Sequence, residues 1–215
     1  MMAERLHTSA PEQLARGLTA LGIDCASAVQ DKLLAYAALL QKWNKVHNLT
    51  ALREESQVVS HHLLDSLAVL PHIRDVNHLA DIGSGGGLPG IPLAIARPDM
   101  QVALVESNNK KAVFLQQAKI ELQLANISVH AERVEALQPE EKFDAVISRA
   151  FSDLADFVKL AGHLIAPGGV LLAMKGVFPH EEVAQLPEGW RVRESVALQV
   201  PELDAQRHLL IIERT

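Results

Sequence analysis

The sequence is poor in cysteine and in long apolar runs, and each shortage excludes a class of protein. Cys25 is the single cysteine of the 215 residues, which excludes an internal disulfide and a zinc site built from several cysteines. No uncharged apolar run reaches the roughly 18 residues that a membrane-spanning helix needs. The N-terminus also lacks the basic and apolar regions of a secretion signal, so we expect a cytoplasmic protein that does not enter a membrane.

Positive charge is scarce as well. The 20 lysine and arginine residues are outnumbered by 26 aspartate and glutamate residues, and the formal net charge is -6 at pH 7. This balance argues against a protein coated in basic charge for gripping duplex DNA. Apolar residues make up 48% of the chain, which is enough to bury a sizeable core. The length suits one domain, or a core domain with an extension.

The first 75 residues have the pattern of helices. Apolar residues recur at helical spacing in two stretches, and a third such stretch runs from Val59 to Leu70 before Pro71 ends it. Ser56 is expected to cap this third helix. The block is too thin for a separate domain. We therefore expect residues 1–75 to pack as a helical extension onto a core domain formed by residues 76–215, in one compact unit.

Short apolar runs alternate with helical segments from residue 78 onward. The expected strands are 78–82, 101–105, 127–130, 143–148, 170–174, 190–199 and 208–212, and the expected helices are 89–96, 108–124 and 152–164. This alternation predicts an α/β fold with a mostly parallel, seven-stranded, Rossmann-like sheet. The last two strands are expected to form an antiparallel hairpin at one edge. In the helix over 108–124, Val113 and Ile120 are expected on the side that packs inward.

The segment 81–90, with the sequence DIGSGGGLPG, follows the first expected strand and opens a helix. Four glycines within five residues allow a tight turn and a close approach of the backbone to a ligand. The N–H groups at the start of the helix favour a polar or anionic ligand group. A glycine-rich turn that binds nothing is the alternative, but the strand–turn–helix context favours a ligand.

Two cofactor classes compete for this loop. The dinucleotide pattern G-x-G-x-x-G can be placed on Gly85, Gly87 and Gly90, but a proline lies inside it and the strand ends in the charged Asp81. The alternation of glycines from Gly83, directly after that aspartate, is more typical of a loop that binds S-adenosylmethionine. The Asp81 carboxylate can then offset the positive charge of the ligand, or it can simply cap the N–H groups of the loop.

Glu106 ends the second expected strand and lies about 20 residues past the glycines, where an acidic side chain can accept both hydroxyls of a ribose. A plain N-cap for the following helix is the alternative. Val134 and Glu135 follow the third strand, where backbone groups could bind an adenine edge. Arg149 ends the fourth strand and Lys175 the fifth. Because the carboxyl ends of parallel strands meet, these residues are expected in one cleft, unless the two cations only face solvent.

Together these motifs resemble a known family, the small-subunit ribosomal RNA guanine-N7 methyltransferases (RsmG, formerly glucose-inhibited division protein B). The resemblance covers nearly the whole chain. It rests on the segments 42–45 and 48–50 (KWNK and NLT), 62–66 (HLLDS), 81–95, 146–150 (VISRA), 175–176 (KG), 201–204 (PELD) and 207–209 (RHL). The combination of GLPGIP with ISRA and RHL is specific, whereas no single piece is.

The resemblance implies a class I S-adenosylmethionine-dependent methyltransferase fold and methyl transfer to N7 of a guanine, position 527 of 16S ribosomal RNA. The cofactor contacts that it implies are Gly83, Leu88, Val134, Glu135 and Arg149. We also predict cofactor contacts for Gly85, because it lies in the glycine loop, and for Glu106, because it lies at the end of the second strand. Positions 84 and 86 are Ser and Gly where relatives can have Thr and Pro, a difference that loosens the turn without changing the ligand.

Guanine N7 carries a lone pair and no proton, so the transfer needs no general base, and the sequence identifies no catalytic residue. We also expect no metal. Binding RNA still requires cations for phosphates and polar groups for the base. The segment 41–53 contains three cations and no acid, although it can also be a solvated helix face followed by a loop. The candidate RNA-binding residues are Lys42, Asn48, Arg53, His62, Lys175 and Arg207.

The expected partner is 16S ribosomal RNA or a small-subunit particle, bound by a monomer. A methyltransferase acting on another RNA or on a small molecule is the first alternative, and the polar segment 41–53 disfavours the small molecule. A dinucleotide-dependent oxidoreductase is the second alternative, and the residues around the glycine loop disfavour it. With a net charge of -6, RNA binding must depend on local basic patches and on the shape of a structured target.

Overall fold

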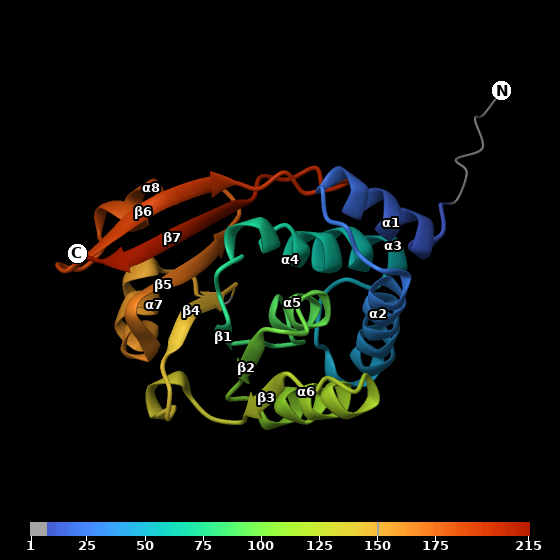
Figure 1. Cartoon of the computed structure of the whole chain (residues 1–215), viewed down its shortest axis with the longest axis horizontal. Helices are drawn as coiled ribbons and strands as arrows, with labels where there is room; N and C mark the ends of the chain where they lie inside the picture. The colour runs from blue at the N-terminus through green and yellow to red at the C-terminus, as the bar shows by residue number, and fades with distance from the viewer. Residues whose placement is uncertain (1–7, 150) are drawn as a thin grey trace.

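A seven-stranded sheet with the order β3-β2-β1-β4-β5-β7-β6 lies at the centre of the computed structural model, which describes residues 8–149 and 151–215 (Figure 1). The strands are β1 His78–Ile82, β2 Gln101–Val105, β3 Ile127–His130, β4 Phe143–Ser148, β5 Ile165–Lys175, β6 Trp190–Ala197 and β7 His208–Arg214. Strands β1 to β5 pair in parallel, whereas β7 is antiparallel to both β5 and β6. The predicted Rossmann-like sheet with an antiparallel edge hairpin is therefore confirmed.

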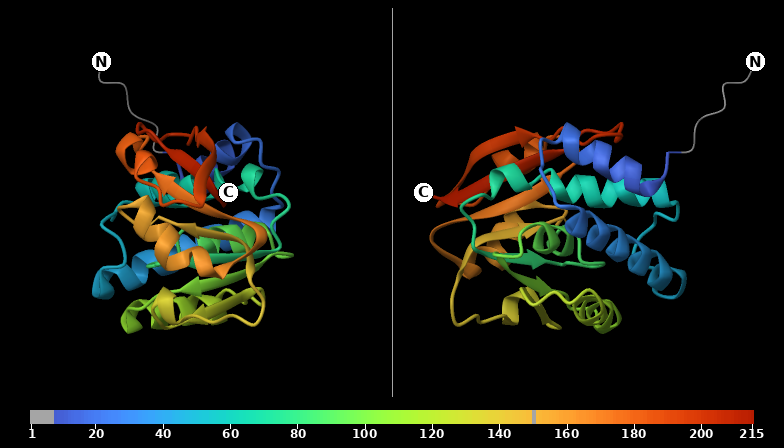
Figure 2. Two further views of the ribbon diagram at one scale, coloured as in Figure 1. Left: turned by 90° about the vertical axis from the view of Figure 1, so that its left-hand side faces the viewer. Right: turned by 45° about the vertical axis from the view of Figure 1, so that its right-hand side comes forward.

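Helices cover both faces of this sheet. They are α1 Ala10–Ala20, α2 Ser27–His47, α3 Glu55–Val58, the π-helical η1 Val59–Leu64, α4 Asp65–Leu67, η2 Leu70–His72, α5 Gly90–Ala96, α6 Asn109–Glu121, η3 Val134–Ala136, α7 Leu154–Ala161, η4 Gly162–Leu164 and α8 His180–Ala184. The N-terminal helices gather at one end of the sheet, beside α5 and α6 (Figure 2). The residues 1–7 of the predicted extension lie outside the described part of the chain.

Alternate residues of the strands pack into two apolar layers, one on each face. In β1, Leu79 faces the layer that contains α2, α5 and α6, whereas Ala80 and Ile82 face the layer that contains α7. The first layer also holds fully buried leucines of the N-terminal helices, among them Leu14 and Leu40. The N-terminal helices thus share one continuous apolar cluster with the sheet, which ties them to the part of the molecule that carries the glycine loop.

The N-terminal helices begin at local signals in the sequence. Helix α1 starts with a capping box, in which Ser9 and Glu12 exchange hydrogen bonds. Segments α3, η1 and α4 follow one another without a break, and the π-helical turn lies in the middle of them. The prediction that Ser56 caps this run is wrong, because the helix already begins at Glu55 with Glu54 before it. Ser56 lies inside the first turn, and its carbonyl accepts a hydrogen bond of 3.0 Å from Gln13 Nε2.

The predicted inner side of α6 is also wrong. Val113 and Ile120 are 58% and 64% exposed, whereas Ala112, Leu115 and Ala118 are buried. Apolar residues occur on both sides of this helix, so spacing alone could not identify the packed side. The two alanines have small side chains that let the helix lie close to its neighbours, and this close packing decides the orientation. None of the helices in the described residues combines the length and the apolar character that a membrane crossing requires.

Candidate cofactor site and nucleic-acid interface

The glycine loop joins β1 to α5 at the carboxyl edge of the sheet. Gly83 and Gly85 have φ angles of 69° and 58°, in the left-handed region that glycine adopts without strain. Gly90 is needed for a different reason, because a Cβ atom there would clash with Leu104 and lie 2.8 Å from Asp81 Oδ2. The loop therefore requires glycine for its conformation at one end and for close packing at the other.

Asp81 is fully buried below this loop. Its Oδ2 accepts a hydrogen bond of 2.9 Å from the Gly90 N–H, while Oδ1 has no hydrogen-bond partner among residues 8–149 and 151–215. Burial raises the pKa of this carboxyl to about 7, against the lowering effects of the Gly90 N–H and of the Arg149 charge. Asp81 therefore does cap an N–H group, that of Gly90 at the start of α5, which was the alternative to a role in offsetting the charge of a ligand.

Glu106 connects the glycine loop to the turn that follows β2. Its Oε2 accepts from the Gly85 N–H and its Oε1 from the Asn108 N–H, both at 2.8 Å, and the residue is 7% exposed. The N-cap of α6 is Asn108 itself, whose side chain accepts from the N–H groups of Lys110 and Lys111. Neither of the two roles predicted for Glu106, binding a ribose or capping the next helix, includes this bridge. A carboxylate oxygen can accept more than one hydrogen bond, so the bridge is compatible with ribose hydroxyls as further donors.

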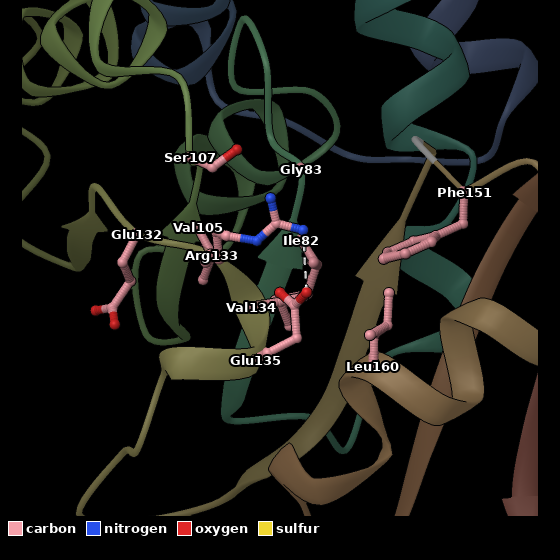
Figure 3. Close-up of a pocket in the computed structure, with 10 residues that line it drawn as sticks. All are labelled: Ile82, Gly83, Val105, Ser107, Glu132, Arg133, Val134, Glu135, Phe151 and Leu160. Atoms are coloured by element: carbon pink, nitrogen blue, oxygen red, sulfur yellow. Dashed lines mark hydrogen bonds and ion pairs between the residues drawn. The ribbon is translucent and has the colours of Figure 1, made fainter.

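A cavity of about 200 Å³ opens beside the loop (Figure 3). Its lining residues are Ile82, Gly83, Val105, Ser107, Glu132, Arg133, Val134, Glu135, Phe151 and Leu160. In Figure 3 the side chains of Phe151 and Leu160 stand on one side of the space, and Arg133 and Glu135 form an ion pair on the other. This combination of an apolar wall and a polar turn suits a ligand with an aromatic ring and polar edges.

Three of the predicted cofactor residues, Gly83, Val134 and Glu135, line this cavity, whereas Gly85, Leu88, Glu106 and Arg149 do not. Leu88 is buried in the apolar cluster and hydrogen-bonds through its N–H to the Ser84 carbonyl at 3.0 Å. Sequence reasoning missed Phe151, which stacks on Phe157 with ring centroids 5.1 Å apart. Its place directly after the ISRA segment was the available signal. Ala150, the last residue of that segment, lies outside the described residues.

Arg149 lies instead at the junction between the sheet and the N-terminal helices. Its Nη1 donates to Asp65 Oδ2 at 3.0 Å, and Nε of Arg207 donates to the other oxygen, Asp65 Oδ1, at 2.9 Å. Asp65 comes from α4, Arg149 follows β4, and Arg207 precedes β7. One buried carboxylate thus joins three segments that are far apart in the sequence.

Lys175 lies at the end of β5 and has partners for all three of its ammonium hydrogens. The Nζ atom contacts the Phe151 carbonyl at 3.1 Å, the Ser152 carbonyl at 2.9 Å and Glu182 Oε2 at 2.7 Å. The side chain is 11% exposed. This lysine holds the loop after β4, including the aromatic wall of the cavity, against α8.

The polar residues after α2 hold one another in place. Asn44 Oδ1 accepts from the Thr50 N–H at 2.9 Å, and the Thr50 hydroxyl lies 2.7 Å from His62 Nε2. Asn48 ends α2 in the left-handed conformation, with φ of 48°, and is exposed. His62 is 6% exposed, and burial together with the nearby Arg149 charge lowers its pKa to about 4. His62 is therefore a neutral, packed histidine in this structure.

Lys42, Lys45 and Arg53 line one groove, of about 410 Å³, on the outer side of α2. All three are exposed, and no ion pair to any of them occurs among the residues that the structure describes. The groove also includes Gln41 and Asn44, which add hydrogen-bonding groups. The cations that the sequence placed close together along the chain are thus close together in space.

Helix α2 also reaches the glycine loop. Tyr36, the single tyrosine of the sequence, is fully buried, and its hydroxyl donates to the Gly86 carbonyl at 2.6 Å. Leu40 packs so closely on Gly86 that a Cβ atom there would lie 3.0 Å from Leu40 Cδ1. Helix α2 therefore carries residues of the basic groove and also contacts the glycine loop, whose residue Gly83 lines the cavity.

Comparison with known proteins gives a consistent result. A family model described as rRNA small subunit methyltransferase G matches residues 29–210. The chain is 62% identical over 205 residues to ribosomal RNA small subunit methyltransferase G of Aromatoleum aromaticum, with 94% of this chain and 97% of that protein covered. It is 61% identical to the protein of the same name from an Azoarcus species, with coverage of 94% and 95%.

Solved structures with a similar fold are methyltransferases of low sequence identity. The O-methyltransferase TomG from Streptomyces achromogenes, solved in complex with SAM, has a TM-score of 0.56 and 19% identity, with 85% of this chain and 89% of that chain covered. TrmN from Thermus thermophilus has a TM-score of 0.53 and 17% identity, with coverage of 70% and 48%. At these identities the likeness supports the fold alone.

Proposed function

The chain belongs to the rRNA small subunit methyltransferase G family, and from this premise we propose that it transfers a methyl group from S-adenosylmethionine to N7 of guanine 527 in 16S ribosomal RNA. The observation that carries the proposal is the contact between Tyr36 and Gly86. Through it, helix α2 connects a glycine loop of the cofactor type to a groove lined by exposed cations. A nucleotide cofactor and a polyanionic substrate are the two ligands that such a pair of sites would bind.

The residues around the cavity fit S-adenosylmethionine. The Gly83 backbone presents no side chain where a ligand has to approach, and Phe151 and Leu160 offer an apolar surface for an adenine ring. Glu106 follows β2 beside the loop, where its carboxylate can accept ribose hydroxyls in addition to the two N–H groups that it already binds. Asp81 lies buried behind the loop, and because its pKa is about 7, the ionised fraction of its carboxyl at neutral pH places negative charge there, which suits a cationic ligand.

The chemistry places few demands on the protein. S-adenosylmethionine supplies an activated methyl group on a sulfonium, and guanine N7 supplies the lone pair that attacks it. Because no proton has to leave N7 before the attack, no side chain needs to act as a base. The residues of this chain therefore contribute by orienting the two reactants in line and by excluding water from the site. Gly83 and Val134, which line the cavity, orient the cofactor in this proposal.

The basic groove would hold the phosphates of the RNA. Lys42, Lys45 and Arg53 are exposed and form no ion pair with residues 8–149 or 151–215, so they are available to phosphate oxygens. Lys175, by contrast, donates all three of its ammonium hydrogens to groups of this chain. We propose that it orders the loop after β4 instead of touching RNA. Asn48 is exposed beside the groove, whereas the buried His62 supports the segment through Thr50.

We also propose that residues 1–75 and 76–215 work as one unit, as a monomer in the cytoplasm. The shared apolar cluster and the Asp65 contacts to Arg149 and Arg207 support one unit. Sedimentation of the purified protein should give the mass of a single chain of 23.4 kDa. A stable dimer in that measurement would overturn the proposed state.

The decisive experiment is methyl transfer from labelled cofactor to 16S ribosomal RNA that lacks the modification. The RNA should be offered both naked and assembled in small subunits, and the modified base should be mapped. We expect one 7-methylguanosine per RNA, at position 527. Methyl transfer to another base, or labelling of small molecules without labelling of RNA, would disprove the assignment. NADH binding in calorimetry, without S-adenosylhomocysteine binding, would disprove the cofactor class.

A further inference from the structure

Asp65 binds two arginines at once, and it does so at the carboxyl edge of the sheet. Its Oδ2 accepts from Arg149 Nη1 at 3.0 Å and its Oδ1 from Arg207 Nε at 2.9 Å. Arg149 follows β4, and Arg207 precedes β7, whose first residue pairs with the last residue of β5. Since β4 and β5 are neighbours in the sheet, the two guanidinium groups come from the edge where ligands of this fold bind.

The three charges leave a net positive group. The Asp65 side chain is 4% exposed, while the arginine side chains are 27% and 26% exposed. Within the described residues, the Arg149 guanidinium donates the bond to Asp65 alone, and Arg207 donates to Asp65 and to the Gln206 carbonyl. A guanidinium carries more N–H donors than these contacts use. Both arginines therefore keep donors for a ligand while their common counter-ion lies inside the protein.

The surroundings of this group do not cancel its charge. His62 packs nearby, and burial lowers the pKa of this histidine to about 4, so it is neutral at neutral pH. The buried Asp81 is near enough to sense the Arg149 charge, but the aspartate itself is turned to the Gly90 N–H. Two guanidinium groups held around one carboxylate would repel each other without it, and one of them would turn towards solvent.

We propose that Asp65 is a positioning residue that holds Arg149 and Arg207 together as a binding site for one oxyanion. This inference rests on the proposed function. Paired guanidinium groups bind carboxylates and phosphates through parallel N–H···O bonds, and both anions belong to the proposed reaction. The carboxylate is that of the amino-acid part of the cofactor, and the phosphate is a phosphodiester of the RNA. Both anions accept hydrogen bonds from guanidinium groups in the same way, and experiment can distinguish which of them binds here.

The test is the variant Asp65→Asn, which removes the charge and keeps the shape. Calorimetry should compare S-adenosylhomocysteine, which has the carboxylate, with 5′-methylthioadenosine, which lacks it. If the site binds the cofactor carboxylate, affinity for S-adenosylhomocysteine should fall about tenfold while affinity for methylthioadenosine stays unchanged. If the site binds a phosphodiester, both affinities should stay unchanged and the KM for undermethylated small subunits should rise about tenfold, with kcat retained.

Two results would overturn the inference. The first is unchanged affinity and unchanged KM in Asp65→Asn. The second is an equal loss of affinity for both nucleosides, which would indicate general distortion. Should Asp65→Asn not fold, Arg149→Lys and Arg207→Lys replace it, because each keeps its charge and loses the planar fork. These variants should likewise lower either the affinity for S-adenosylhomocysteine alone or the apparent affinity for small subunits alone. An equal loss of affinity for both nucleosides would again overturn the inference.

Glu202→Gln provides a matched control. Glu202 also joins the N-terminal helices to the segment before β7, through Gln13 and Arg16, but it has no contact with either arginine of the Asp65 group. We expect wild-type affinities and KM in this variant. Wild-type protein that methylates small subunits confirms the reaction independently, so failure of the Asp65 inference can be distinguished from failure of the proposed function.

Discussion

The hydroxyl of Tyr36 donates a hydrogen bond of 2.6 Å to the carbonyl oxygen of Gly86, and this contact joins helix α2 to the loop between β1 and α5. Both residues are buried. Besides packing on the sheet, the N-terminal helices thus hold the loop that is proposed to bind the cofactor, because Tyr36 of α2 anchors Gly86.

Tyr36→Phe should weaken the binding of S-adenosylhomocysteine about threefold to tenfold, the range expected when one hydrogen bond to a buried carbonyl is lost. The ring of the phenylalanine still fills the space, so the loop loses an anchor without a large cavity. Calorimetry gives the affinity, and circular dichroism at 25 °C shows that the variant is folded. Wild-type affinity in a folded variant would show that the loop needs no anchor from α2.

Gly83→Asp should abolish measurable cofactor binding, because a side chain and a negative charge would enter the cavity at a residue with φ of 69°. Gly22→Asp is the matched control, since Gly22 has φ of 67° and nothing lies within 4 Å of a Cβ atom there. Both variants carry the same backbone strain, but only the first changes the cavity. Equal binding by the two variants would mean that the cavity is not the cofactor site.

Lys42→Glu combined with Arg53→Glu should lower methylation of small subunits about tenfold or more at low salt, and leave S-adenosylhomocysteine affinity unchanged. The salt dependence of RNA binding should also become less steep, since fewer counterions are released. The double variant Lys119→Glu with Lys159→Glu makes the same charge change at two other lysines, the half-buried Lys119 of α6 and the exposed Lys159 of α7. Equal losses in both double variants would indicate general charge repulsion and no specific RNA groove.

His62 should make the protein less stable in mild acid. The folded chain holds this histidine neutral with a pKa of about 4, whereas the unfolded chain takes up a proton near the ordinary value of 6.5. The contribution to stability is therefore fully present above about pH 6.5. It is lost as the pH falls from there towards 4, by an amount on the order of 3 kcal/mol.

Urea denaturation at neutral and at mildly acidic pH measures this loss. In His62→Gln the difference between the two conditions should shrink, because the residue that binds the proton in the unfolded chain is gone. His47→Gln removes a histidine that is exposed at the end of α2, and it should behave like the wild type. Identical pH dependence in His62→Gln and the wild type would show that the burial of His62 does not control acid stability.

Strands were predictable from the sequence because their signal is local. The bounds expected for β1 to β4 agree with the structure, and β5 begins earlier, at Ile165 instead of residue 170. Helix α6 shows the limit of such reasoning, since Val113 and Ile120 had the expected spacing and yet face solvent. Which side of a helix packs depends on the neighbours that the fold supplies, and these are not encoded in the spacing of one helix.

The lining of the cavity was predictable in part, because Gly83 follows β1 directly and Val134 and Glu135 lie in the turn after β3. The site was less predictable where one polar group serves several segments. Arg149 could be placed at the end of β4, but its bond to Asp65 depends on a helix 84 residues earlier in the chain. Likewise, the three partners of Lys175 come from a loop and a short helix that no periodic pattern indicates.

The bond between Gln13 and Glu202 spans 189 residues of sequence, and that between Asp65 and Arg207 spans 142. During synthesis the first helices therefore leave the ribosome long before their partners near the end of the chain exist. Until the last hairpin is made, water takes the place of these partners around Gln13 and Asp65. A chain that is released early would have its glycine loop and no second arginine for Asp65. Synthesis of the last hairpin is thus itself the step that completes the contacts of Asp65.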